Sequence, residues 1–355
     1  MAAVWDSRCA RSTDRGRISP TRPYGSVSLT KGCSMSAQRD RLDPASREPL
    51  EMLLQAIPGG FNAIPDIVER RAIVDGLLAA QMADVPANDR VVAEDRVIPG
   101  PPGAPDLPVR VYTPVDGTGV ELPGVFYIHG GGMILGGIPA NELTCAMLCE
   151  TLNAVVVSTG YRKAPEDPHP AQSQDCYAGL TWTVEHAGEL GIDARRLAVF
   201  GGSAGGNLAI AVAMMARDKG GPTICFVMAP YPMLDDRNVT ASSHEVTEVG
   251  IWDRAGNVEA WSWFLGGQDP DAYAAPARAT DLTGLPPMFI DVGDMDLFRD
   301  EDIDFAARLL QAGNPLEFHV YPGAYHASEV FAPTADLSQR IWGTRLAALT
   351  RALHH

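Results

Sequence analysis

One serine stands in surroundings that suggest nucleophilic chemistry. Residues 201–205 read GGSAG, a GxSxG pentapeptide that lies between an apolar run and an alanine-rich segment. Where this pentapeptide joins a strand to a helix, the tight turn holds the serine hydroxyl above the sheet at the start of the helix. The sequence therefore predicts that Ser203 is a nucleophile.

A serine hydroxyl needs a histidine to accept its proton and a carboxylate to orient that histidine. In folds that place the serine on such a turn, the order along the chain is serine, acid, histidine. The histidine should follow the last strand, as His326 does. His319 lies inside a strand pattern and is expected to be structural. The three histidines that precede the serine are poor candidates for the base: His129, His169 and His186.

Several carboxylates follow the seventh apolar run, where the acid is expected. Asp291 falls within the strand pattern itself. Asp300 and Glu301 begin a helical segment, where acidic residues interact favourably with the helix dipole. Asp294 and Asp296 remain, and their spacing alone does not distinguish them.

A glycine triplet could stabilise the oxyanion that forms when an ester carbonyl is attacked. Residues 129–132 read HGGG and follow the third apolar run. A glycine-rich backbone can approach a substrate closely and direct its N–H groups at developing negative charge. We therefore expect this loop to supply oxyanion donors.

The elements that position these residues alternate along the chain. Eight short runs have the pattern of strands, namely 90–98, 107–113, 125–128, 154–158, 197–200, 224–228, 288–292 and 316–321. Helical segments separate the later runs, at 141–152, 172–190, 204–217, 300–312 and 335–353. This alternation predicts an α/β fold with a mostly parallel eight-stranded sheet flanked by helices.

Two segments stand outside this alternation. Apolar residues recur at helical spacing between residues 48 and 82, with a break at a Pro-Gly-Gly sequence, which predicts two or three helices. Residues 242–267 interrupt the pattern between the sixth and seventh strands. Their aromatic residues could form an apolar lid or the core of a cap: Trp252, Trp261, Trp263 and Phe264.

Five motifs together resemble one family. They are HGGG at 129–132, GYRKAPEDPHPA at 160–171, GGSAGG at 201–206, DLFRDE at 296–301 and PGAYH at 322–326. In this order they are similar to the hormone-sensitive-lipase-like family of α/β-hydrolases, the bacterial type IV esterases, over about residues 48–353. The resemblance implies an α/β-hydrolase domain at 90–355, N-terminal cap helices at 35–89 and a cap insertion around 242–267.

The resemblance also implies roles for individual residues. The family's catalytic aspartate stands three residues before Arg-Asp-Glu, which is Asp296 here. The oxyanion donors would be the backbone amides of Gly131, Gly132 and Ala204. His129 of the glycine motif is structural in such enzymes and braces the loop.

Two positions depart from the family pattern. Many relatives carry Asp before the nucleophile, where this chain has Gly202, and an acidic residue before Tyr-Arg, where it has Gly160. Neither departure removes a triad member. Both are expected to change local hydrogen bonding and loop rigidity.

The expected function is a serine carboxylesterase, a carboxylic ester hydrolase that acts on short-chain esters through an acyl-enzyme. The triad is Ser203, Asp296 and His326, and no cofactor or metal is required. We expect Met133, Ile134 and Trp252 to contact the substrate. An amidase, a lactonase or a carbohydrate deacetylase could use the same triad. A non-catalytic small-molecule receptor is a further alternative, although receptors that resemble this family lack the triad histidine.

Composition limits the partners of the protein. The 355 residues include 44 acidic against 28 basic side chains, for a net charge of -16, which argues against nucleic acid and anionic membrane surfaces. The longest apolar run, 208–216, is too short to span a membrane. The six cysteines form no CxxC motif, which favours a reducing compartment, and we expect a cytoplasmic protein.

Two expectations concern the ends of the chain. Residues 1–34 are rich in Arg and Ser without helical periodicity, so we expect an extension that is disordered or non-native, with Met35 as the natural initiator. An organellar transit peptide is the alternative, because such segments are also rich in Arg and Ser. The final helical segment has apolar residues that could cover its own sheet or a second copy in a homodimer.

Overall fold

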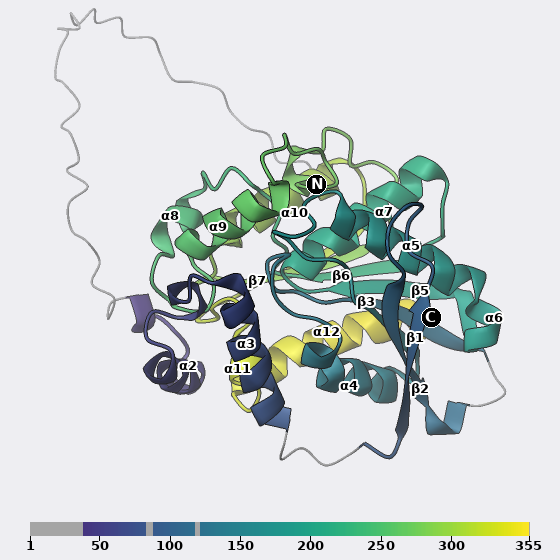
Figure 1. The fold of residues 1–355 in the computed structure, drawn as a ribbon, viewed down its shortest axis with the longest axis horizontal. Coiled ribbons are helices and arrows are strands. Elements are labelled where there is room, and N and C mark those ends of the chain that lie inside the picture. The colour runs from purple at the N-terminus through teal and green to yellow at the C-terminus, as the bar shows by residue number, and fades with distance from the viewer. Residues whose placement is uncertain (1–37, 83–87, 118–120, 355) are drawn as a thin grey trace, which may run out of the picture. The chain divides into compact units, whose positions relative to one another are not determined.

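The computed structural model describes residues 38–82, 88–117 and 121–354 (Figure 1). The expectations for residues 1–34 therefore lie outside the described residues, as do Cys9 and Cys33. Within the described ranges, no helix combines the length and the apolar character that crossing a bilayer requires.

A single eight-stranded sheet organises the described chain. Its strands are β1 (Val91–Ile98), β2 (Leu107–Pro114), β3 (Leu122–Ile128), β4 (Val155–Thr159), β5 (Ile192–Gly201), β6 (Phe226–Pro230), β7 (Met288–Gly293) and β8 (Leu316–Tyr321). Their spatial order is β1-β2-β4-β3-β5-β6-β7-β8. The β1–β2 and β2–β4 pairs are antiparallel, and every other pair is parallel. The predicted mostly parallel sheet is confirmed.

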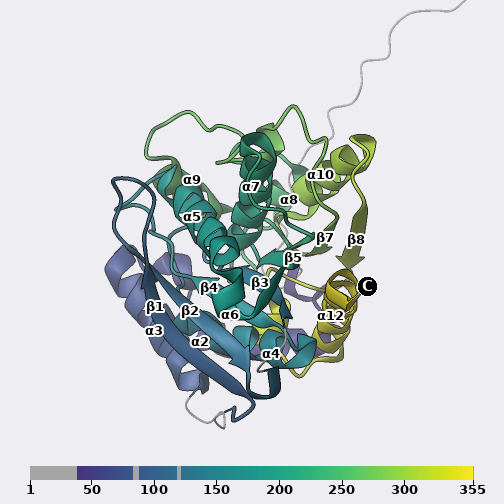
Figure 2. The same ribbon diagram turned by 90° about the vertical axis from the view of Figure 1, so that its right-hand side faces the viewer.

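Helices cover both faces of this sheet (Figure 2). One face carries α5 (Ala171–Glu185), α7 (Ala204–Lys219) and α10 (Arg299–Gln311), and the other carries α4 (Glu142–Leu152) and α12 (Asp336–His354). Successive side chains of β3 alternate between the two apolar clusters: Phe126 and Ile128 belong to the first, and Val125 and Tyr127 to the second. Both faces of β3, β4, β6 and β7 are buried, and these strands are therefore mainly apolar.

The last helix packs on its own sheet. Leu349 and Leu353 of α12 are fully buried in the same cluster as Phe200 of β5. The apolar residues of the final segment thus cover the chain's own sheet, which is one of the two arrangements expected from the sequence.

Several boundaries differ from those expected, and two of the differences fall between residues 172 and 200. The helix predicted over 172–190 is divided at His186 into α5 and α6 (Ala187–Leu190), because the His186 ring bonds to the carbonyl of Trp182 as the helix ends. Strand β5 begins at Ile192 rather than 197, since Ile192 pairs with Leu122 at the start of β3.

The segments expected to form a cap contact one another (Figure 1). They comprise α2 (Pro44–Ala56), α3 (Ile67–Met82), α8 (Ala241–Glu245) and α9 (Arg254–Leu265), with the short turns η1 (Phe61–Ala63) and α11 (Ser328–Phe331) beside them. Arg70 of α3 donates to Glu259 of α9 at 2.6 Å and lies over the Trp263 ring. Asn62 donates to Asp253 at 3.1 Å. The remaining short helices are η2 (Val115–Gly117), η3 (Pro139–Asn141) and η4 (Pro276–Arg278).

Candidate active site

The structure brings Ser203, His326 and Asp296 into one hydrogen-bonded line. His326 Nε2 lies 3.0 Å from Ser203 Oγ, and His326 Nδ1 lies 2.8 Å from Asp296 Oδ2. The three residues are 7%, 6% and 1% exposed, respectively. The imidazole is held edge-on between the rings of Tyr231 and Phe298. A hydroxyl, a base and an orienting carboxylate in this geometry can perform nucleophilic acyl transfer.

The turn between β5 and α7 places the serine. Ser203 has φ 58° and ψ -121°, a conformation that L-residues rarely adopt, and its N–H donates to Pro230 at 2.9 Å. A Cβ at position 205 would lie 2.2 Å from the Ile128 carbonyl oxygen. Only glycine therefore allows the start of α7 to pack this closely against β3.

The spacing of the sequence did not distinguish Asp294 from Asp296, but the two side chains have different hydrogen-bond partners. Asp296 Oδ2 is the atom near His326, and Asp296 Oδ1 accepts from the N–H of Phe298 at 3.0 Å. Asp294 Oδ1 instead accepts from the N–H of Gly323 at 2.7 Å. The Asp294 side chain thus links Gly323, in the loop that leads to His326, to the turn that carries Asp296.

The other histidines that were considered lie away from the serine. His319 remains in β8 and bonds to Glu317 at 2.9 Å. His129 is completely buried, stacks on Tyr161 and bonds through Nδ1 to the Gly130 carbonyl at 2.8 Å. Burial lowers the pKa of His129 to about 3, so this ring is neutral at physiological pH.

The loop after β3 has the backbone that close approach to a substrate requires. Gly131 and Gly132 have φ 110° and 62°. A Cβ at position 132 would lie 2.2 Å from the ring of Trp252. The backbone hydrogen bonds of the described ranges include many that lie outside regular helices and strands. None of these has the N–H of Gly131, Gly132 or Ala204 as its donor. These three donors therefore remain available for a substrate oxygen.

A cavity of about 510 Å³ opens beside the serine. It is lined by Ser203, His326 and the glycine loop, and also by residues of α2, α3, α12 and the segment before α9. Trp252, one of the expected substrate contacts, lines this cavity. The size is within the range of pockets that bind small molecules.

Met133 and Ile134, the other two expected substrate contacts, are fully buried in the core, and neither is among the residues that line the cavity. The carbonyl of Gly131 accepts from the N–H groups of Ile134 and Leu135, which closes a tight turn. Met133 lies in this turn with φ 66°. The turn directs Met133 and Ile134 into the core and leaves Leu135 at the cavity.

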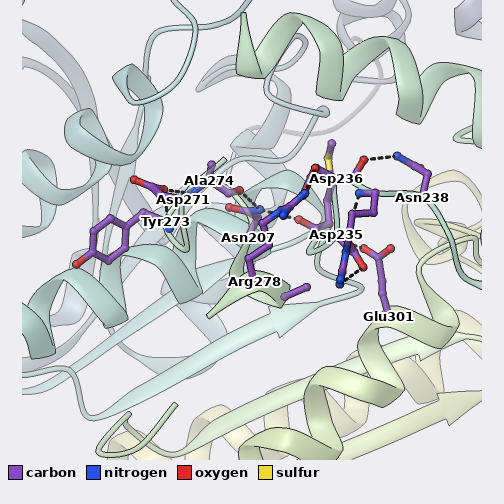
Figure 3. A network of polar contacts seen from close by, with 12 residues as sticks. Asn207, Asp235, Asp236, Asn238, Asp271, Tyr273, Ala274, Arg278 and Glu301 are labelled. Carbon is purple, nitrogen blue, oxygen red and sulfur yellow. Dashed lines mark hydrogen bonds and ion pairs between the residues drawn. The ribbon is translucent and has the colours of Figure 1, made fainter. Parts of the chain in front are cut away.

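A polar network that includes Asn207, Asp235 and Glu301 holds the segment that follows β6 (Figure 3). Asn207 of α7 donates to the carbonyls of Met233 and Ala274 at 2.7 and 2.9 Å. Glu301 accepts from the N–H groups of Leu234 and Asp235. The segment that follows β6 is therefore fixed against α7 and α10. Met233 in turn donates its N–H to the Ser203 carbonyl at 3.1 Å.

Sequence reasoning missed a buried charge network beside the histidine. Arg345 of α12 forms a bidentate pair with Asp291 and donates to Glu329 at 2.6 Å. Tyr231 also donates to Glu329, at 2.5 Å. Burial opposes ionisation of Glu329, but the Arg345 guanidinium lowers its pKa below the ordinary value. These residues come from separate elements and share no local motif, so no sequence signal could have grouped them.

Comparisons with known proteins agree with the fold and the site. A family model described as the alpha/beta hydrolase fold matches residues 125–330. Carboxylesterase NlhH of Mycobacterium tuberculosis is 36% identical over 324 residues, covering 89% of this chain and 98% of that protein. Esterase LipI of the same organism is 35% identical over 296 residues, covering 80% and 91%. The solved structure of a bacterial heroin esterase has a TM-score of 0.84 and 37% identity, covering 89% and 99%.

The parallel sheet, the strained serine turn and the neighbouring histidine and aspartate define an α/β-hydrolase. The chain belongs to the α/β-hydrolase fold family, and within it to the hormone-sensitive-lipase-like bacterial esterases. It is a carboxylic ester hydrolase, as the motifs predicted.

Proposed function

We propose that Ser203, His326 and Asp296 are the catalytic triad, and that the preferred substrates are short-chain carboxylic esters. The observation that carries this proposal is the hydrogen-bonded line in which His326 lies 3.0 Å from Ser203 and 2.8 Å from Asp296. At these distances His326 can accept the proton of the Ser203 hydroxyl, and Asp296 can orient the His326 ring, which supports the proposal.

In this mechanism Ser203 Oγ attacks the ester carbonyl while His326 Nε2 takes the hydroxyl proton. Asp296 stabilises the imidazolium that forms and holds the ring in position. The tetrahedral intermediate then breaks its bond to the alcohol, which leaves with the proton from His326. His326 then takes a proton from water, and the resulting hydroxide attacks the acyl-enzyme carbonyl. The second tetrahedral intermediate breaks its bond to Ser203 Oγ, which takes the proton back from His326 as the carboxylic acid leaves.

The oxyanion of both intermediates is bound by the N–H groups of Gly131, Gly132 and Ala204. Their position at a glycine turn and at the N-terminus of α7 supports this role, because donors fixed before the reaction need no reorganisation as charge develops. Removal of one such donor typically costs about 2.7–4 kcal/mol of transition-state stabilisation.

The proposed cap consists of α2, α3, α8, α9 and the segments that join them. Its supporting observation is that Leu53, Phe61, Leu77 and Trp252 line the cavity above the serine. A largely apolar, confined site of about 510 Å³ suits a small ester better than a triglyceride.

A cytoplasmic location is part of the proposal. The cysteines of the described residues, Cys145, Cys149, Cys176 and Cys225, are all free thiols. Free thiols of this kind suit a reducing compartment.

Substitution of the nucleophile tests the function. Turnover of p-nitrophenyl acetate and butyrate should fall by several orders of magnitude in Ser203→Ala. Ser262→Ala, which changes an exposed serine of α9, is the matched control and should match the wild type. Near wild-type turnover by Ser203→Ala would refute the triad. Faster hydrolysis of the matched butyranilide than of the butyrate ester would instead favour an amidase.

A further inference from the structure

Two groups of residues line the cavity beside Ser203. One part, the cap arm, is lined by residues of the proposed cap: Leu53, Phe61, Val74, Leu77, Ile251 and Trp252. The other part, the sheet arm, lies among β3, η3, α4, β5 and α12, and is lined by Tyr127, Asn141, Thr144, Phe200, Trp342 and Arg345. Most residues that line the sheet arm thus lie on or beside the α4 and α12 face of the sheet.

The strongest polar groups of the sheet arm are already bonded to the protein. Tyr127 donates to Asn141 Oδ1 at 2.9 Å, and Asn141 Nδ2 donates to the Gly137 carbonyl at 3.0 Å. Arg345 donates to both Asp291 and Glu329. A ligand in this arm would gain little by competing for these groups, since each has its partner.

The surface that the sheet arm offers is mainly aromatic. The Tyr127 and Phe200 rings stack at 5.2 Å between centroids, and the Phe200 and Trp342 rings stack at 6.3 Å. Binding at such a surface is favourable because it removes apolar groups of the ligand from water. The chemistry of the arm therefore favours an apolar chain.

Residue 202 stands where the sheet arm meets the serine. Gly202 lines the cavity between the loop at Gly130 and the ring of Tyr231. A Cβ at this position would lie 3.3 Å from Tyr231 Cε2 and 3.5 Å from its hydroxyl. A longer side chain at this position would compete with the Tyr231 ring for space at the wall of the cavity. The departure from the family pattern at Gly202 thus leaves the entrance of the arm open.

We propose that the sheet arm binds an apolar chain of the ester, and that Gly202 is a specificity-determining residue because it leaves the arm accessible from Ser203. This inference rests on the proposed function of Ser203. It predicts that the chain-length preference depends on residue 202 and on the far end of the arm.

The test compares two ester series in wild type, Gly202→Ala, Gly202→Val and Thr144→Phe. One series has p-nitrophenol with acyl chains from acetyl to octanoyl, and the other has acetates of alcohols from ethyl to octyl. The ratio of kcat/KM for the longest to the shortest ester should fall at least about tenfold in Gly202→Val. Thr144→Phe should lower the same ratio without touching the serine turn. Gly188→Val, at a glycine with open space around it, should leave the ratio unchanged.

Each outcome bears on the proposal. A fall in the acyl series identifies the bound chain as the acyl group, and a fall in the alcohol series identifies it as the leaving alcohol. The proposal is overturned if folded Gly202→Val and Thr144→Phe keep the wild-type ratio of kcat/KM for the longest to the shortest ester in both series. It is also overturned if these variants lose kcat/KM equally on all esters. Retained turnover in Ser203→Ala would instead contradict the triad itself.

Discussion

Arg71 of α3 donates a 2.7 Å hydrogen bond from Nε to the carbonyl of Ile134, in the loop that follows β3. The same guanidinium donates to the Ala164 carbonyl at 2.7 Å and forms a bidentate pair with Glu166 at 2.8 and 2.9 Å. One side chain thereby joins a helix of the proposed cap to the glycine loop. The loop that carries the proposed oxyanion donors is therefore stabilised partly from outside the sheet.

Replacement of Arg71 by Ala should loosen this loop. Two carbonyls lose their donor, so the free energy of unfolding should fall by about 1–3 kcal/mol in urea titrations. We expect kcat for p-nitrophenyl butyrate to fall more than KM rises, with partial recovery on addition of guanidinium at millimolar concentration. Arg90→Ala removes a largely exposed arginine and is the control. An unchanged kcat in Arg71→Ala would show that the loop holds its shape without the cap.

A methyl group at residue 132 should disable the site by displacing Trp252. In Gly132→Ala the new Cβ would lie 2.2 Å from the indole, in a backbone conformation that disfavours alanine. We expect kcat/KM for p-nitrophenyl acetate to fall at least about 100-fold, the size of losing one oxyanion donor. In Gly137→Ala the nearest atoms are at 3.8 Å, so its activity should remain close to wild type. Equal activity of the two variants would contradict the arrangement of this loop.

The two neighbouring aspartates should respond differently to the same substitution. Asp296→Asn removes the charge beside His326 and should lower kcat about 10⁴-fold, with KM little changed. In Asp294→Asn the amide oxygen can still accept from Gly323, so activity should be largely retained. Steady-state kinetics of both variants, with circular dichroism to verify folding, provide the comparison. Equal losses would argue against Asp296 as the orienting acid.

The buried histidine of the glycine motif should make stability depend on pH. Burial lowers the pKa of His129 to about 3 in the folded state, below its ordinary value of 6.5. The unfolded chain therefore binds this proton first as pH falls, and the contribution of His129 to stability decreases from pH 6.5 towards pH 3. The loss approaches about 1.4 kcal/mol per pH unit in this window.

Urea unfolding of wild type and His129→Gln at pH 7.5, 5.5 and 4.5 measures this effect, because other titrating groups are common to both proteins. The stability advantage of the wild type should shrink as pH falls. An advantage that is constant across these three pH values would show that His129 is not buried as a neutral ring.

The local patterns of the sequence were sufficient for the fold. Buried parallel strands must be apolar on both faces, so the short runs at β4 and β7 were recognisable without a partner. A serine between glycines at a strand–helix junction and a histidine after the last strand follow from the same chain order. These features depend on neighbours in sequence, which is why Ser203 and His326 could be identified first.

Features that depend on contacts between distant elements required the tertiary structure. Spacing alone left Asp294 and Asp296 equivalent, and the family resemblance implied Asp296. The hydrogen bonds of the folded chain then distinguish the two, with Asp296 on His326 and Asp294 on Gly323. The burial of Met133 and Ile134 likewise depends on a positive-φ turn that the sequence pattern did not indicate.

No local motif in the sequence indicated the network of Arg345, Glu329 and Tyr231, because these residues lie on α12, on α11 and directly after β6. The sequence determined the class of the protein and its reactive serine through local pattern and composition. The tertiary structure decided which charged residues meet in the buried network and which side chains line the cavity, because both depend on the packing of elements that are far apart along the chain.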